Sequence, residues 1–146
     1  RTEDDVKAIT EGICDGTIDC IVTDHAPHSA EEKADFEKAP NGVVGRETSL
    51  AATLTALYHT GKVSLRRIVS LMCVNPRKLR GLDVPAIKEG STADLLIADI
   101  NKKWTVEPEK LHSKSHNTVF KGMELTGKPL VTISKGEIRF DARNDK

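Results

Sequence analysis

Residues 18–28 read IDCIVTDHAPH, and this stretch decides the fold class. Its first part, residues 18–23, is short, mostly apolar and rich in β-branched side chains. That composition is typical of a strand covered on both faces, as in a parallel sheet with helices on either side. One such strand cannot bury itself, because it needs neighbouring strands and their helices. The stretch therefore predicts an α/β fold in which this chain carries the last βα part of a larger barrel or sheet.

Helical patterns surround this expected strand. Thr2, followed by acidic residues, predicts a helix N-cap, and the apolar residues that follow recur at helical spacing until Gly16. Residues 25–47 contain prolines and glycines without a sustained period, so we expect a long loop there. Two more helices are expected after it, one ending at Gly61 and one that is capped by Ser64 and broken at Asn75-Pro76. Pro76 can then open a short helix that ends near Gly81.

The pattern changes to a period of two from residue 84 onward. Residues 95–98 predict a short strand, and residues 131–140 predict a hairpin that turns at Lys135-Gly136. We therefore divide the chain into 1–83, the C-terminal end of an α/β barrel, and 84–146, a small antiparallel β unit.

Composition excludes several classes of protein. The 146 residues include 22 basic and 22 acidic ones, and a chain without excess positive charge is not suited to nucleic acid. No apolar run approaches the ~20 residues that a membrane-spanning helix needs. Three cysteines without metal-type spacing, Cys14, Cys20 and Cys73, are expected to be small buried side chains in a reducing cytoplasm. The first methionine is Met72, so we expect a fragment of a longer protein.

The chemistry is expected where the strand ends, since active sites of parallel α/β folds form at the carboxyl ends of strands. Asp24 would be the last strand residue, with its carboxylate in the mouth of the barrel. His28 lies four residues further on, past a proline, and could face the same mouth. His25 should point away if the backbone is still extended. An aspartate here can also be a simple turn residue, and loop histidines are often only solvated.

The motif at Asp24 and several later ones resemble the C-terminal portion of dihydroorotases of the bacterial type I class, within the amidohydrolase superfamily. The resemblance covers nearly the whole chain but only about the last third of such an enzyme. The motif TDHAPH is specific, whereas the motif at residues 90–95 marks the wider superfamily. The matching segments are residues 23–28, 31–33, 38–42, 45–48, 75–76, 90–95 and 113–118.

The resemblance implies a zinc-dependent (β/α)8 TIM-type barrel with a small β-sandwich built from both chain ends. It implies interconversion of N-carbamoyl-L-aspartate and L-dihydroorotate in de novo pyrimidine biosynthesis. Asp24 matches a residue that is both a metal ligand and the catalytic general acid/base, and His28 matches one that binds the substrate carboxylate. Asn41 and Gly42 match the loop that contacts the substrate through its main chain; the family commonly has Phe at the position of Asn41.

The same resemblance places the other metal ligands upstream of Arg1, so we expect this chain alone to be inactive and to bind zinc weakly at most. Two alternatives stay open: a non-catalytic dihydroorotase-like scaffold subunit, and a hydantoinase- or allantoinase-type cyclic amidohydrolase. The expected partner is a small-molecule substrate, and a homo-oligomer is left open. In the β unit, Lys114 and His116 are expected in a solvated loop.

Overall fold

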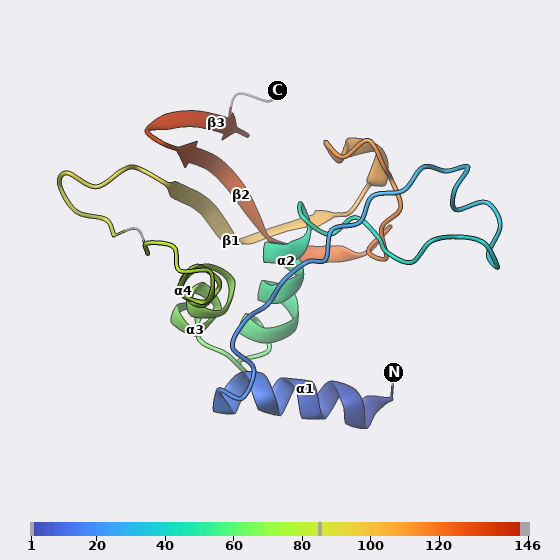
Figure 1. Ribbon diagram of the computed structural model, residues 1–146, viewed down its shortest axis with the longest axis horizontal. Helices are drawn as coiled ribbons and strands as arrows, with labels where there is room; N and C mark the ends of the chain where they lie inside the picture. Colours follow the sequence, from blue (N-terminus) through green and yellow to red (C-terminus); the bar gives the residue numbers. More distant parts are fainter. Residues whose placement is uncertain (1, 85, 144–146) are drawn as a thin grey trace.

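The computed structural model describes residues 2–84 and 86–143, so Arg1, Pro85 and residues 144–146 of the two predicted domains lie outside the described part. Its α-helices come first along the chain and its β-strands follow (Figure 1). The elements are α1 (Glu3–Asp15), α2 (Ser49–Thr53), a π-helical turn η1 (Leu54–Tyr58), α3 (Leu65–Val69), a π-helical turn η2 (Ser70–Val74), α4 (Asn75–Leu79), β1 (Leu95–Thr105), a 3₁₀ turn η3 (Pro108–Lys110), β2 (Glu124–Ser134) and β3 (Glu137–Asp141).

Helix α1 begins and ends where the sequence predicts. The side chain of Thr2 accepts a hydrogen bond from the backbone N–H of Asp5, and the carboxylate of Asp5 accepts one from the backbone N–H of Thr2. This reciprocal pair satisfies backbone donors that a helix start otherwise leaves free. Gly16 ends the helix with φ of 96°, a left-handed conformation that glycine adopts without strain.

The helical segment that begins at Leu65 continues without a gap through α3, η2 and α4. Element η2 passes directly into α4, so the helix does not break at Pro76 as predicted, whereas the short helix that Pro76 is expected to open is confirmed as α4. The reason is that Pro76 lies in the first turn of α4, where its missing N–H costs little. The start of α3 agrees with the sequence, since the Ser64 hydroxyl accepts from the Arg67 backbone N–H at 3.2 Å.

The strands form one antiparallel sheet in the order β1-β2-β3. The predicted hairpin is confirmed: Lys135 and Gly136 both have positive φ, 52° and 82°, as a two-residue turn between twisted strands requires. The strand expected at 95–98 is much longer, and it continues through Trp104 despite a register shift after Asp99. The strands of the described residues form this single layer, and the second layer of the expected sandwich is not found among these residues.

The helices pack against the sheet through a close backbone approach. Gly127 of β2 faces Leu54 of η1, where a Cβ at residue 127 would lie 2.4 Å from the Leu54 Cδ1 atom. Leu54 is fully buried, with Ile13, Leu57, Val63, Ile68 and Leu71 in the same cluster. A second cluster joins Ala51 of α2 to Val106 and Leu125 around the sheet. Figure 1 shows the helices between α1 and the sheet, so packing continues across the predicted division at residue 83.

Residues 18–23 are not a strand in the described chain, which corrects the prediction for this segment. They run extended beside the helices, where Ile21 N–H donates to the Leu71 carbonyl at 3.0 Å and the Asn75 side chain donates to the Asp19 carbonyl at 2.8 Å. A strand is defined by a ladder of paired backbone groups, and the ladder partners that a parallel strand needs are absent from the described residues. The long loop expected at residues 25–47 is present, with turns at residues 30–33 and 36–38.

Candidate functional site

Asp24 lies at the end of this extended segment, where the sequence places the chemistry. Its backbone has φ of 43°, in the left-handed region that few residues other than glycine adopt. Its side chain is exposed, and none of the hydrogen bonds among the described residues uses its carboxylate. Residues held in such conformations cluster at functional sites, where the surrounding structure offsets the strain. The carboxylate is thus free to meet a metal or a substrate.

The structure brings together the other three predicted site residues. His28 Nε2 lies 3.1 Å from the carbonyl oxygen of Asn41, and the His28 ring is largely covered, with 22% of its side chain exposed. The other ring nitrogen, Nδ1, lies 3.5 Å from a Glu32 carboxylate oxygen. Within the loop, Lys33 Nζ donates to the Pro40 carbonyl and so joins two parts of the loop. His28 therefore reaches the main chain of the loop that carries Asn41 and Gly42.

The loop needs a glycine at residue 42. Its φ is 116°, and a Cβ on it would lie 2.5 Å from Ala26 Cβ and 3.6 Å from His28 Nε2. The neighbouring residues join the two parts of the loop, since Ala26 N–H donates to the Val43 carbonyl at 3.0 Å. Any side chain at residue 42 would push the loop away from the segment that follows Asp24.

His25 has a structural role that the sequence did not indicate. Its Nδ1 accepts hydrogen bonds from the backbone N–H groups of Gly45 and Arg46, at 3.2 and 3.3 Å. It also forms an isolated parallel bridge with Val43. Nδ1 therefore carries no proton in this arrangement, and the ring ties the end of the loop to the residue beside Asp24.

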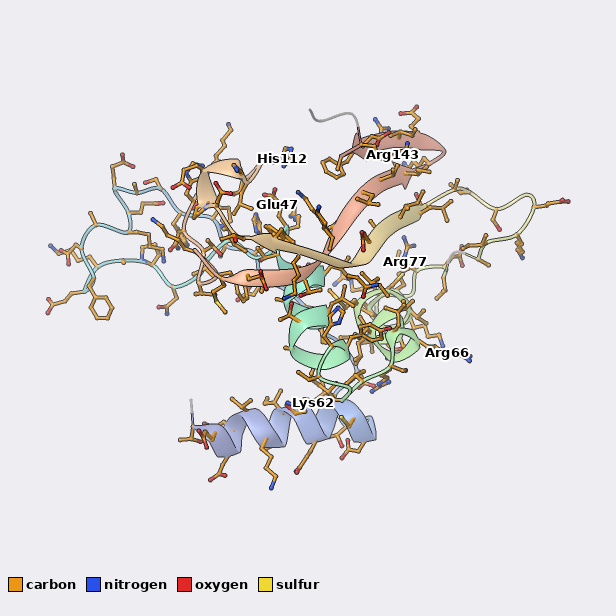
Figure 2. The ribbon with its side chains drawn as sticks, turned by 180° about the vertical axis from the view of Figure 1, so that it is seen from behind. Glu47, Lys62, Arg66, Arg77, His112 and Arg143 are labelled. Carbon is orange, nitrogen blue, oxygen red and sulfur yellow. The ribbon has the colours of Figure 1, made fainter. Side chains whose placement is uncertain are left out.

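Glu47 is a second residue that the sequence did not single out for a role. Its carboxylate accepts hydrogen bonds from the backbone N–H groups of His112 and Ser113, at 2.8 and 3.0 Å, and lies 3.0 Å from His112 Nδ1. Figure 2 labels Glu47 and His112 on facing segments. Burial raises the pKa of Glu47, but these hydrogen bonds outweigh it, so the pKa lies below its ordinary value.

Asn117 completes the contacts on the candidate loop. Its side-chain Nδ2 donates to the Gly42 carbonyl at 3.0 Å, and its own carbonyl accepts from the Val44 N–H at 2.8 Å. Asn117 lies in the sequence motif at 113–118, which the sequence analysis used only for the resemblance. All six residues of that motif are polar, so composition alone does not single out Asn117. Lys114 and His116 beside it are exposed, as expected.

The described residues contain no group of three or more His, Cys, Asp and Glu side chains that could hold a metal ion. Asp24 can thus supply one oxygen ligand, whereas catalytic zinc usually has about three protein ligands. The three cysteines are free thiols. Cys14 and Cys73 are exposed, which corrects the expectation that they are buried, and Cys20 is half-buried.

A cleft lies elsewhere, over the sheet. It has a volume of about 510 Å³, and its lining includes Glu47, Trp104, His112, Lys128 and Phe140. None of the predicted site residues is among the residues that line it. Glu47 and its partner His112 both line this cleft.

Comparison with known proteins gives the class. A family model described as the amidohydrolase family matches residues 1–139, and the chain belongs to this family. A protein of Clostridioides difficile (strain 630) named dihydroorotase is 46% identical over 143 residues, which are 97% of this chain and 34% of that protein. A dihydroorotase of Acetivibrio thermocellus is 44% identical over 139 residues, 94% of this chain and 33% of that protein. The chain thus spans about a third of the length of these curated relatives.

A solved structure agrees with the described fold. The L-hydantoinase (dihydropyrimidinase) from Arthrobacter aurescens superposes with a TM-score of 0.84 at 35% identity, covering 97% of this chain and 33% of that one. The arrangement of helices and sheet is therefore that of a cyclic amidohydrolase of the family. Within the described residues, none of the helices has the length and apolar character for crossing a bilayer.

Proposed function

We propose that the chain is the C-terminal third of a dihydroorotase that interconverts N-carbamoyl-L-aspartate and L-dihydroorotate in pyrimidine biosynthesis. The observation that carries the proposal is the meeting of His28 with the Asn41–Gly42 main chain, beside the strained Asp24. The identity of 44% or more to proteins named dihydroorotase supports the choice of substrate. The division at residue 83, into barrel end and β-sandwich part, belongs to the same proposal.

Asp24 is the proposed catalytic residue, the general acid/base of the reaction. In hydrolysis of the ring, one carboxylate oxygen of Asp24 takes a proton from the attacking water as its oxygen bonds to the carbonyl carbon. The same carboxyl group then gives the proton to the ring nitrogen as the C–N bond breaks. Amide nitrogen is a poor leaving group until it is protonated, so one positioned group serves both steps.

Asp24 is also the proposed zinc ligand from this chain. The exposed carboxylate fits the role because oxygen donors suit zinc and because the described residues leave it unused. Zinc, when bound, would polarise the scissile amide as a Lewis acid. The described residues supply no complete ligand set, so the remaining ligands would come from upstream chain.

His28, Asn41 and Gly42 are the proposed substrate-binding residues. A ring N–H of His28 would donate to the substrate carboxylate, and the main chain of Asn41 and Gly42 would contact the ring. These contacts orient the ring so that its amide faces Asp24, which lowers the entropic part of the barrier. His28 now contacts Asn41 and Glu32, so a bound carboxylate would replace one of these partners.

The test is turnover of three rings by the full-length protein, meaning this chain with the upstream two thirds that its relatives have. We expect hydrolysis of L-dihydroorotate to exceed that of hydantoin and allantoin in kcat/KM. The alternative, a hydantoinase-type enzyme, is favoured by the similarity to the Arthrobacter aurescens structure. Faster turnover of hydantoin would select that alternative, and turnover of none of the rings would refute both.

A further inference from the structure

Two consecutive carbonyl groups of the candidate loop contact side chains from two different segments. The Asn41 carbonyl lies 3.1 Å from His28 Nε2, and the Gly42 carbonyl accepts from Asn117 Nδ2 at 3.0 Å. A peptide plane is rigid, so fixing these carbonyls also fixes the direction of the N–H groups of Gly42 and Val43. Asn117, which is distant in sequence, thus sets the main-chain geometry of the loop.

Asn117 holds the loop with its main chain as well as its side chain. Its carbonyl accepts from the Val44 N–H at 2.8 Å, and Val44 is buried, with 3% of its surface exposed. The two hydrogen bonds span the turn at Gly42, whose positive φ gives it freedom that other residues lack. Removing the side-chain bond would leave Gly42 free to reorient while Val44 stays anchored.

The segment that carries Asn117 is stiffened by its own side chains. The Ser113 hydroxyl accepts from the Ser115 N–H, and the Ser115 hydroxyl accepts from the Asn117 N–H, both at 3.3 Å. Ser115 is buried. Such hydrogen bonds two residues along the chain form local turns. Asn117 is therefore presented by a pre-organised segment and is suited to hold another loop in place.

Glu47 gives the same two segments a second attachment. Its carboxylate accepts from the backbone N–H groups of His112 and Ser113, at 2.8 and 3.0 Å. Hydrogen bonds to an ionised acceptor are stronger than neutral ones. The segment of residues 112–118 thus meets the loop at both ends, at Gly42 through Asn117 and at Glu47. We call these two attachments the clasp.

We propose that Asn117 is a positioning residue: through Gly42, it holds the loop main chain in the geometry that binds the substrate. Glu47 keeps the segment of Asn117 in register with the loop. This inference rests on the proposed function, because it takes the Gly42 loop as the part that meets the ring. It adds a residue from the C-terminal half to a site otherwise built from residues 24–42.

The test compares Asn117→Ala, Asn117→Asp and the control Asn101→Ala in the full-length enzyme. Asn101 is exposed in β1, away from the loop. Aspartate has the shape of asparagine but cannot donate to the Gly42 carbonyl when ionised. We expect both changes at residue 117 to raise KM for L-dihydroorotate about 5- to 10-fold, the range of one lost hydrogen bond, with kcat within about twofold. The control should leave both constants unchanged.

Two kinetic outcomes would overturn the inference. Wild-type KM in Asn117→Asp, with Asn117→Ala impaired, would mean that only packing at residue 117 matters. A fall in kcat with unchanged KM would mean a general loss of folded enzyme.

A second measurement separates the inference from the proposed function. Hydrogen exchange of the peptide covering residues 41–47 should be faster in Asn117→Ala than in Asn101→Ala, whatever ring the enzyme hydrolyses. Equal exchange would overturn the inference. Inactivity of the wild-type enzyme toward dihydroorotate would refute the proposed function, and the exchange result would still decide whether Asn117 holds the loop.

Discussion

The sequence predicts strand in the β2–β3 hairpin and in the first part of residues 18–28, but different contacts hold these two regions. The hairpin pairs with itself around a two-residue turn, and its partners are near neighbours in sequence. Residues 18–28 have one isolated bridge, from His25 to Val43, and single hydrogen bonds to the helices. The strands of the hairpin thus pair with each other, whereas residues 18–28 are held by chain that is far from them in sequence.

This difference decides where a change should matter. A change in the sheet should alter stability, because the sheet and the helices behind it form the packed core. A change in residues 18–28 should alter the chemistry first, since Asp24 is exposed and these residues are all exposed or half-buried.

The largest expected effect is the loss of all activity when the 146-residue chain is assayed alone. Asp24 is then one ligand without the rest of a zinc site, and one carboxylate does not hold catalytic zinc. Metal analysis after dialysis should find far less than one zinc per chain, and hydrolysis of L-dihydroorotate should equal the buffer rate. Measurable turnover by the purified chain would show that residues 18–28 form a working site without the upstream chain.

The next effect is that of Asp24→Asn in the full-length enzyme. An amide cannot carry the proton from water to the leaving nitrogen, so kcat should fall about 10³-fold, within the range for a lost general acid/base. The matched control is Asp19→Asn, which removes an exposed carboxylate from the same extended segment. Near-normal kcat in Asp24→Asn, or an equal fall in both variants, would refute the catalytic role of Asp24.

Gly127→Ala should have the largest effect on stability. A Cβ there would lie 2.4 Å from Leu54 Cδ1, and Leu54 is fully buried and cannot move aside. With φ of 105° as well, we expect a loss of about 3 kcal/mol in the free energy of unfolding. Urea unfolding of the chain can be followed by the fluorescence of Trp104, whose Nε1 donates to the Gly127 carbonyl.

The control for this substitution is Gly136→Ala in the hairpin turn. Its φ is 82°, but a Cβ there would meet nothing within 4 Å. The cost should therefore be only that of the backbone conformation, about 1 kcal/mol. Equal losses in the two variants would mean that the contact between β2 and η1 does not hold the sheet to the helices.

Gly42→Ala is the corresponding change in the loop. A Cβ would lie 2.5 Å from Ala26 Cβ, so the loop must shift away from His28. We expect KM for L-dihydroorotate to rise about tenfold in the full-length enzyme, with a smaller change in kcat. Gly61→Ala, at another positive φ but with open space around it, should leave KM unchanged. An unchanged KM in Gly42→Ala would remove the loop from the substrate site.

The sequence was most informative where structure is local. The N-cap at Thr2, the turn at Lys135-Gly136 and the cap at Ser64 are set by neighbours within a few residues, and all three are confirmed. The break at Pro76 was wrong because η2 runs directly into α4, but the short helix expected to begin at this proline is confirmed. The strand at 18–23 was not formed because its ladder partners are not local.

The candidate site divides in the same way. The motif around Asp24 identified His28, Asn41 and Gly42, and the structure brings these three together. The motif gave no indication of Asn117, because its hydrogen bond to Gly42 spans 75 positions in sequence. Distant contacts of this kind follow from the tertiary fold and not from a local pattern.

The smallest expected effect is a pH dependence of the clasp. Because the pKa of Glu47 is below its ordinary value of 4.5, its carboxylate stabilises the folded chain at neutral pH. This stabilisation is present above pH 4.5 and is lost as the pH falls through the lower folded pKa. Glu47→Gln should cost about 1 kcal/mol at pH 7, since the hydrogen bonds to His112 and Ser113 weaken without the charge.

The measurement is urea unfolding of the chain and of Glu47→Gln at pH 7 and at several values below pH 4.5. The difference in free energy of unfolding between the unmodified chain and Glu47→Gln should decrease as the pH falls, because a protonated Glu47 resembles the neutral amide. Glu109→Gln, at an exposed residue of η3, should show no gap at any of these values. A gap at residue 47 that persists at low pH would mean that shape, and not charge, joins the loop to the segment of Asn117.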